Sequence, residues 1–208
     1  MKDFLILRLQ GAMQAWGRPT LEEWRPTHNF PTRSGIVGII GACLGIERNE
    51  VGLLYDLSHS FRFVARLDMR PFPMRKIVDF HTVKKPRLAP QSTRKLGIVT
   101  EREYLCDAQF SLALEFVAEA RYSLEQVREA VQRPVYTPFL GRKSCPLGQP
   151  LYFGTIQAQD LLAALSLVEP DDGPIYSEVK FSQAREMVVR DIPTRHFRKF
   201  LPRTIYIK

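Results

Sequence analysis

The stretch YLCDAQFSLALEF, residues 104–116, places an apolar side chain at every second position. Such alternation is typical of a β-strand that turns one face to the core and the other to solvent. We therefore expect one continuous strand from Tyr104 to Phe116, with Cys106 on its inner face. Its outer face would carry the polar side chains Asp107, Gln109, Ser111 and Glu115.

The other elements follow from apolar periodicity and from capping residues on either side of this strand. Thr32 or Ser34 can begin a helix that ends near Gly45, and Ser123 with Gln126 forms a capping box. We expect helices over residues 32–44, 50–60, 124–132 and 160–167, and strands over 4–9, 61–68, 135–140, 151–158, 175–181, 187–191 and 204–207.

Without residues 70–103, this order is the βαββαβ unit of ferredoxin-like and RNA-recognition-motif folds, an α+β class. Residues 70–103 break the pattern with four prolines and few periodic apolar positions, so we expect a thumb-like insertion or protruding hairpin there. The sequence thus predicts a single domain over residues 1–208, with a C-terminal β appendage at 175–208. One face of such a sheet is expected to stay open, where it or its loops can hold single-stranded RNA.

Composition limits the class of protein. With 208 residues, 45% hydrophobic and 25% charged, the chain is long enough to bury a core and is not globally disordered. The longest apolar run, residues 35–46, is too short to cross a bilayer, and Arg8 interrupts the apolar start that a signal peptide needs. Three widely spaced cysteines form no disulfide framework, so a cytoplasmic location is expected.

The positive charge is concentrated in two segments. The chain has a net charge of +8, yet residues 70–103 alone hold nine basic and three acidic residues, and residues 185–208 hold seven and two. Clustered basic charge indicates a polyanion partner, most simply a nucleic acid. A solvated basic surface without a partner is the alternative, and a membrane surface is disfavoured because neither segment shows an amphipathic helical stripe.

An irregular loop precedes the first helix. Glycines and prolines exclude a helix over residues 10–31, where tryptophans, arginines and a histidine alternate in the manner of a base-stacking and phosphate-binding surface. The following helix would present free N–H groups beside Arg33, which is a suitable place for a phosphate. Core packing is the alternative for Trp16, and close packing is the alternative for the helix glycines.

Several kinds of chemistry lack the residues they need. No histidine pairs with another histidine or cysteine at metal-ligand spacing, and neither a Walker loop nor the dinucleotide fingerprint is present, so no cofactor is expected. A metal-independent ribonuclease remains an alternative, since His81 with Lys84 and Lys85 could supply an acid, a base and a cation. A second such set is His28 with Arg25 and Arg33.

Six collinear segments, residues 9–17, 30–35, 41–46, 79–83, 102–107 and 136–146, together resemble the CasD family. Its members are subunits of the type I-E CRISPR surveillance complex, Cascade, and sit on the 5′ end of the guide RNA. The resemblance implies a fold of the repeat-associated (RAMP) superfamily with a thumb at about 70–103. It also implies a non-catalytic subunit of antiviral defence that caps the 5′ handle of the CRISPR RNA.

The same resemblance implies partners and contact residues. The partners would be the CRISPR RNA, the large subunit and the backbone subunits of the complex, with target DNA reached only through the complex. Of the residues that match the family's motifs, Arg102 is the first to which the resemblance assigns a contact role, followed by Arg33 and the loop 14–17. Related type I-C subunits cut RNA with a Tyr/Lys/His set that has no close match here, so the endoribonuclease stays the alternative. A subunit whose basic segments meet acidic protein partners is a third hypothesis.

Cationic, aromatic and polar side chains of these segments make up the expected RNA-binding set. It consists of Gln14, Trp16, Arg18, Arg25, His28, Arg33, Ser34, His81, Lys84, Lys85, Arg87, Arg94, Lys95, Arg102, Tyr104, Arg142 and Lys143.

Overall fold

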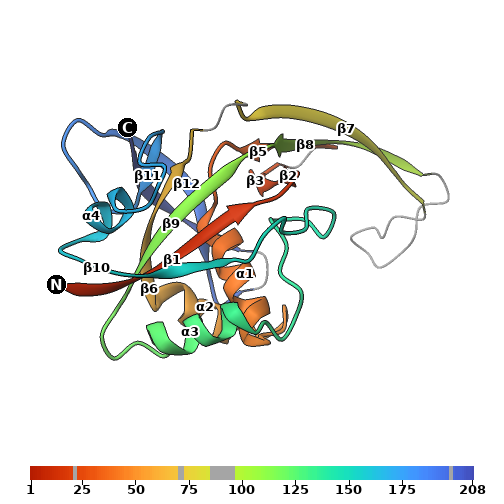
Figure 1. The fold of residues 1–208 in the computed structure, drawn as a ribbon. Helices are drawn as coiled ribbons and strands as arrows, with labels where there is room; N and C mark the ends of the chain where they lie inside the picture. The colour runs from red at the N-terminus through yellow and green to blue at the C-terminus, as the bar shows by residue number, and fades with distance from the viewer. Residues whose placement is uncertain (21–22, 70–72, 85–96, 197–198) are drawn as a thin grey trace.

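The computed structural model describes residues 1–20, 23–69, 73–84, 97–196 and 199–208 (Figure 1). Seven strands form the main sheet, and every neighbouring pair is antiparallel. Their order across the sheet is β10 (Tyr152–Ala158), β1 (Lys2–Gln10), β9 (Gln109–Phe116), β6 (Phe61–Leu67), β11 (Ile175–Ser177), β13 (Phe200–Ile207) and β12 (Arg185–Pro193).

The first four of these strands, with two helices, make the expected βαββαβ unit. The chain runs β1, α1 (Arg33–Leu44), β6, β9, α3 (Leu124–Gln132) and β10, while α2 (Val51–His59) is an addition between α1 and β6. The spatial order β10-β1-β9-β6 is that of a ferredoxin-like sheet, with the first and third strands of the unit in the centre. The α+β fold class read from the sequence is therefore confirmed.

Both faces of the sheet are covered near β1, because its side chains alternate between two apolar clusters. Leu5, Leu7 and Leu9 belong to the larger cluster, beneath α1, α2 and α3 (Figure 1). Phe4 and Ile6 point the other way and pack with the residues of α4 (Leu161–Ser166). The prediction of an open sheet face is thus wrong at this end of the sheet, since the apolar residues of α4 need burial of their own.

The expected strand from Tyr104 to Phe116 is in fact two strands in two sheets. β8 (Ile98–Cys106) ends before Asp107, whose φ of 59° is left-handed, and β9 begins at Gln109. Aspartate tolerates this conformation better than most residues, so the chain changes direction there while the apolar alternation continues. One continuous strand was therefore a wrong prediction, and Cys106 is only partly buried.

The expected polar outer face of β9 is also wrong for two of its residues. Gln109 and Ser111 are buried, and both donate hydrogen bonds to the Asp68 carboxylate, at 2.8 and 2.7 Å. That carboxylate also accepts a hydrogen bond from Arg66, whose side chain is 1% exposed in an ion pair of 3.0 Å. Arg66 donates two further hydrogen bonds, to the Leu165 carbonyl of α4 and to the Val168 carbonyl just after it, so the buried polar groups have partners.

Helix α1 has the caps that the sequence indicated. The Thr32 hydroxyl accepts a hydrogen bond from the backbone N–H of Gly35 at 3.2 Å, and Gly45 ends the helix at φ 77°. The capping box of Ser123 and Gln126 begins α3 as expected. No strand forms over 135–140, contrary to expectation, because the N–H groups of Val135 and Tyr136 instead bond the last carbonyls of α1.

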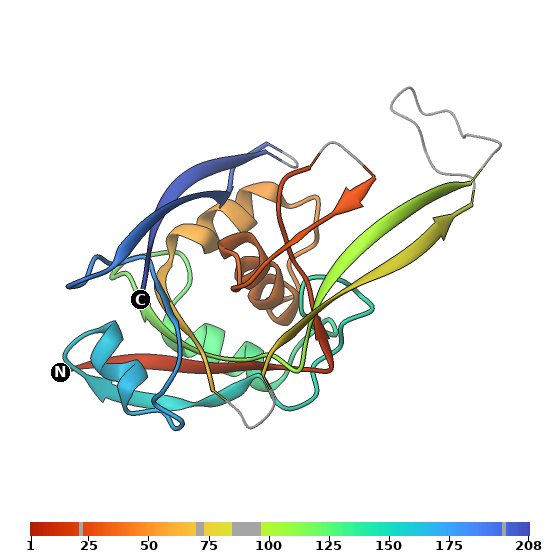
Figure 2. The ribbon, with the colours of Figure 1, turned by 90° about the horizontal axis from the view of Figure 1, so that it is seen from above.

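A hairpin projects from one end of the body (Figures 1 and 2). It pairs β7 (Arg75–Val83) with β8 over nine consecutive residues, which confirms the protruding hairpin expected between residues 70 and 103. On the other edge of β8 lie two short strands of the irregular loop, β2 (Met13–Gln14) and β4 (Trp24–Arg25). A further pair, β3 (Trp16–Gly17) with β5 (Thr27–His28), completes this loop.

The C-terminal strands extend the main sheet, through the pairing of β11 with β6 and of β13 with β11. The division of the chain into one domain with an insertion at 70–103 and an appendage at 175–208 stays a prediction.

Candidate nucleic-acid interface

One side of the projecting hairpin gathers polar and charged residues. In the pairing of β7 with β8, Asp79 lies opposite Arg102 and His81 lies opposite Thr100. On the other edge of β8, Arg25 lies beside Arg102. Because directly paired residues point to the same side of a sheet, Arg25, Asp79, His81 and Arg102 share one side, which we call the polar face.

The opposite side of the hairpin is apolar and exposed. It carries Trp24, Val78, Phe80 and Val99, which we call the apolar face and which are 43%, 49%, 67% and 50% exposed. Trp24 and Phe80 flank Glu101 from the two edges of β8. A cleft of about 490 Å³ on this face is lined by Trp24, Val99, Glu23 and Glu101. The hairpin therefore presents two chemically different surfaces.

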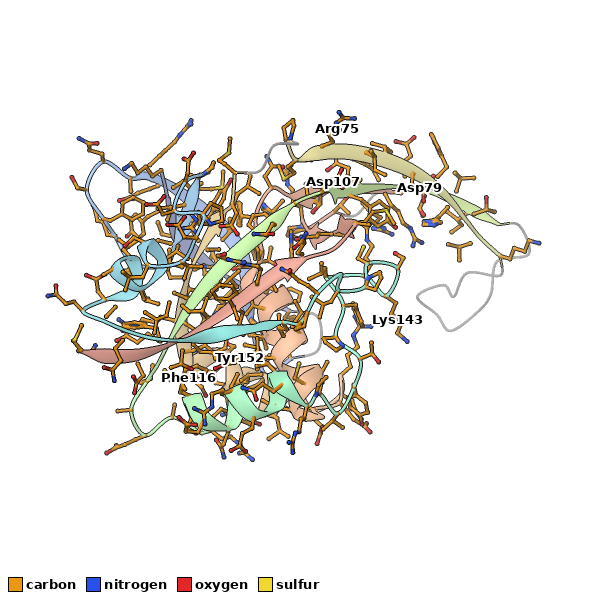
Figure 3. All side chains as sticks on the ribbon, viewed as in Figure 1. Arg75, Asp79, Asp107, Phe116, Lys143 and Tyr152 are labelled. Atoms are coloured by element: carbon orange, nitrogen blue, oxygen red, sulfur yellow. The ribbon has the colours of Figure 1, made fainter. Side chains whose placement is uncertain are left out.

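The loop after residue 140 lies against the root of the hairpin. Gly141, with φ 88°, packs so closely on the Ala15 carbonyl that a Cβ would lie 1.8 Å from its oxygen. Arg142 then stacks over the Tyr104 ring at 4.7 Å and donates hydrogen bonds to two backbone carbonyls. Lys143 follows and is exposed, at the end of a loop that Figure 3 shows below the hairpin carrying Asp79. Tyr104 itself is 2% exposed, so the guanidinium lies between its ring and solvent.

Two of the expected RNA-binding residues in the loop over residues 10–31 lie inside the body. Gln14 and Trp16 are buried, and the Trp16 indole donates to the Gln14 side chain at 3.1 Å. The Gln14 amide in turn donates to the carbonyls of Leu9 and Ala108, at 3.2 and 2.8 Å. Their polar atoms thus hold the irregular loop to the core.

The N-terminus of α1 already holds an anion from within the chain. The backbone N–H of Arg33 donates to Asp191 at 2.7 Å, and the Arg33 guanidinium forms a buried ion pair with Glu178 and a bond of 2.7 Å to the Phe61 carbonyl. The expected phosphate position beside Arg33 is therefore occupied by a carboxylate of β12. Ser34, next to it, is only partly buried.

His28 is an uncharged ring at neutral pH. Burial, and then the nearby charge of Arg18, lower its pKa to about 4. Its ring lies 4.9 Å from that of Phe30, which stacks on Tyr176 at 4.8 Å. Arg18 is exposed, and its side chain has no hydrogen-bond partner in the described part of the chain.

The structure describes the second expected catalytic set completely and the first without Lys85. On the polar face, His81 Nε2 lies 3.2 Å from Asp79 Oδ2, while Lys84 is exposed just beyond β7. In the second set, Arg33 is committed to its buried ion pair, whereas Arg25 is exposed on β4 beside β8. Lys85, Arg87, Arg94 and Lys95 lie outside the described residues.

Cysteine chemistry is unfavourable throughout. Burial raises the pKa of Cys43 to about 12, and burial also raises the pKa values of Cys106 and Cys145. All three are free thiols. Among the described residues, no group of three or more His, Cys, Asp or Glu side chains has an arrangement for holding a metal ion. No helix in the described ranges is long and apolar enough to cross a membrane.

Sequence reasoning missed two contributors to this region, Glu103 and the apolar face. Glu103, 8% exposed, accepts a hydrogen bond from the Thr27 backbone at 2.9 Å and pairs with Lys76 at 3.3 Å. The exposed apolar face follows from the register of β7, whose sequence has no alternation of its own. The one sequence signal for Glu103 was its acidic side chain within a basic segment. No local sequence feature indicated that Phe80 would be exposed on an apolar surface.

Comparisons with known proteins agree with one another. The family described as "CRISPR-associated protein (Cas_Cas5)" matches residues 4–206. The chain is 47% identical over 184 residues to the CRISPR system Cascade subunit CasD of Escherichia coli (strain K12), covering 86% of this chain and 82% of that protein.

Solved structures show the same architecture. A chain of a CRISPR RNA-guided surveillance complex superimposes with a TM-score of 0.73 at 28% identity, covering 99% of this chain and 88% of that one. A second, described as the crystal structure of a Cas protein, gives a TM-score of 0.67 at 27% identity and covers 99% and 93%.

Proposed function

The chain belongs to the Cas5 family of CRISPR-associated proteins, and from this we propose that it is a non-catalytic, RNA-binding subunit of a type I-E CRISPR surveillance complex. In that role it binds and caps the 5′ handle of the CRISPR RNA and links the large subunit to the backbone subunits, within the cytoplasm. The observation that carries the proposal is the projecting hairpin, whose polar face stands beside the cationic loop at Arg142 and Lys143.

Unpaired cations support RNA contact at this position. Arg25, Arg102 and Lys143 have no carboxylate partner in the described ranges, so their charge is available to phosphates. Phosphate contacts supply most of the affinity for nucleic acid, and each one makes binding more sensitive to salt. Neutral His28, beside exposed Arg18, adds a ring on which an unpaired base can stack.

The apolar face supports contact with protein. Exposed apolar side chains in one patch are unusual on a monomer and mark interaction surfaces. Phosphates would be repelled there by Glu23 and Glu101. We therefore assign the polar face to RNA and the apolar face to a neighbouring subunit of the complex.

The test of RNA binding uses the full chain and a labelled single-stranded RNA that carries the repeat-derived 5′ handle. We expect tight binding that weakens steeply with salt, and weaker binding of a scrambled RNA of equal length. Arg102→Ala should lower affinity and reduce the slope of log affinity against log salt by about 0.7, the value for one phosphate of a single strand. Arg133→Ala, an exposed arginine at the end of α3, is the matched control and should change neither.

The same samples test the absence of catalysis. Incubated with the RNA in EDTA and run on a denaturing gel, the protein should leave the RNA intact. The Asp79–His81 pair is the arrangement that favours the alternative, a metal-independent endoribonuclease. A discrete cut that His81→Ala abolishes would overturn the non-catalytic role. Assembly with partner subunits that is unaffected by nuclease treatment would instead favour a purely protein-binding subunit.

A further inference from the structure

Arg142 joins three segments at the root of the hairpin. Its Nη1 donates to the Glu103 carbonyl of β8 at 3.1 Å, and its Nη2 donates to the Arg25 carbonyl of β4, also at 3.1 Å. Its guanidinium lies over the Tyr104 ring at 4.7 Å. The two carbonyls belong to adjacent strands, so one side chain fixes β4 against β8.

Only arginine suits this position. Two diverging N–H groups on one plane reach two carbonyls, while the flat face of the same group stacks on a ring. Lysine offers a single point charge that cannot make all three contacts. The loop is itself fixed, since Gly141 lies against the Ala15 carbonyl and Ala15 donates to the Leu140 carbonyl at 3.0 Å.

The side chain of Glu103 ties the same strands from the opposite face of β8. Its carboxylate accepts a hydrogen bond from the Thr27 N–H at 2.9 Å and pairs with Lys76 of β7 at 3.3 Å. Arg142 and Glu103, which together we call the clamp, thus hold the loop strands and both hairpin strands in one arrangement. Arg25 and Arg102 are adjacent across that arrangement.

We propose that Arg142 is a positioning residue for RNA, acting through Arg25 and Arg102, and that it does not itself bind a phosphate. This rests on the proposed RNA-binding function. Both terminal nitrogens of Arg142 already donate to carbonyls, whereas Arg25 and Lys143 are exposed without such partners. A preformed pair of cations binds more tightly, because less conformational freedom is lost when the RNA arrives.

The test compares conservative variants on the handle RNA by affinity and salt slope. Arg142→Lys keeps the positive charge but loses the planar guanidinium with its two diverging N–H donors. We expect it to lose about tenfold in affinity, nearly as much as Arg142→Ala, with an unchanged salt slope for both. Lys143→Arg should bind like wild type, and Lys143→Ala should reduce the slope by about 0.7. If Arg142→Lys binds like wild type, or if Arg142→Ala flattens the slope while Arg142→Lys does not, Arg142 is a phosphate ligand and the inference fails.

Hydrogen exchange separates positioning from loss of folding. In Arg142→Lys, the amides of Arg25 and Thr27 should exchange faster, while those of β1 and β9 stay protected. Faster exchange throughout the main sheet would show a folding defect and would contradict the positioning role of Arg142. A wild-type chain that fails to bind handle RNA at all would reject the proposed function, whereas wild-type binding with unchanged Arg142 variants rejects only this inference.

Discussion

The backbone N–H of Arg33 donates to Asp191 at 2.7 Å across 158 residues of sequence. The positive end of α1 is thereby closed by a carboxylate of β12, near the far edge of the main sheet. Arg203 completes the group by donating to both Asp191 oxygens, at 2.6 and 2.8 Å, and to Glu178 at 2.9 Å. Burial alone would lower the pKa of Arg203, but the hydrogen bonds and charges of Asp191 and Glu178 together raise it.

Removing this carboxylate should destabilise the fold. Asp191→Ala leaves Arg203 buried without its main partner and α1 without its terminal acceptor. We expect the free energy of unfolding to fall by about 3–5 kcal/mol in urea denaturation. Glu186 lies on the same strand as Asp191 and forms an exposed ion pair with Lys180, so Glu186→Ala is the control and should cost at most about 1 kcal/mol. Equal losses in the two variants would contradict the structural role given to Asp191.

The low pKa of His28 predicts a dependence of stability on pH. The folded ring has a pKa of about 4 and the unfolded ring has the ordinary value of 6.5, so between these values the unfolded chain binds the extra proton. The contribution of His28 is therefore complete above pH 6.5 and is lost as the pH falls toward 4. The free energy of unfolding should therefore differ less between pH 7.5 and pH 5 in His28→Gln than in the wild-type protein. His196→Gln, at an exposed histidine, should leave the difference unchanged.

The two faces of the hairpin should separate RNA binding from assembly. Phe80→Asp places a charge in the centre of the apolar face, so we expect loss of co-purification with the partner subunits and RNA affinity within about twofold of wild type. Val188→Asp, at a residue 72% exposed on β12, controls for a charge placed on an exposed strand and should assemble normally. Loss of RNA binding by Phe80→Asp would show that the faces are not independent.

Gly141 should not tolerate a side chain. A Cβ would meet the Ala15 carbonyl oxygen at 1.8 Å, at a φ of 88° that favours glycine. We expect Gly141→Ala to lower the free energy of unfolding by about 1–3 kcal/mol and to weaken RNA binding by displacing Arg142. A Cβ at Gly154 meets nothing within 4 Å, so Gly154→Ala should stay within about 0.5 kcal/mol of wild type. Wild-type stability in Gly141→Ala would contradict the close packing of this loop.

Trp16 should act on stability more than on RNA. It is 1% exposed, and its ring lies where a Cβ on Gly35 would approach to 2.7 Å. Trp16→Phe keeps a ring but loses the bond to Gln14, and we expect a lower melting temperature with RNA affinity unchanged. A fall in affinity without a change in melting temperature would instead support RNA contact by Trp16.

The site could be read from the sequence only in part. The position of the basic hairpin and the cationic loop at 141–144 followed from charge clustering and turn residues, which are local properties. The burial of Gln14 and Trp16 could not be predicted, because a loop of aromatic and polar residues has the same kind of sequence whether it faces solvent or the core. Nor could the sequence show that Arg33 has a buried carboxylate partner while Arg102 has none among the described residues.

By itself, the sequence determined the βαββαβ order, the caps of α1 and the capping box of α3, because periodicity and capping act between residues a few positions apart. Tertiary structure alone decided that the chain passes from the hairpin into the main sheet at Asp107, that Asp191 closes α1, and that Arg142 joins β4 to β8. Each of these depends on strand register and on partners far away in the chain. A pattern that repeats every second residue continues unchanged through a turn of the backbone, so it cannot report where one sheet ends and another begins.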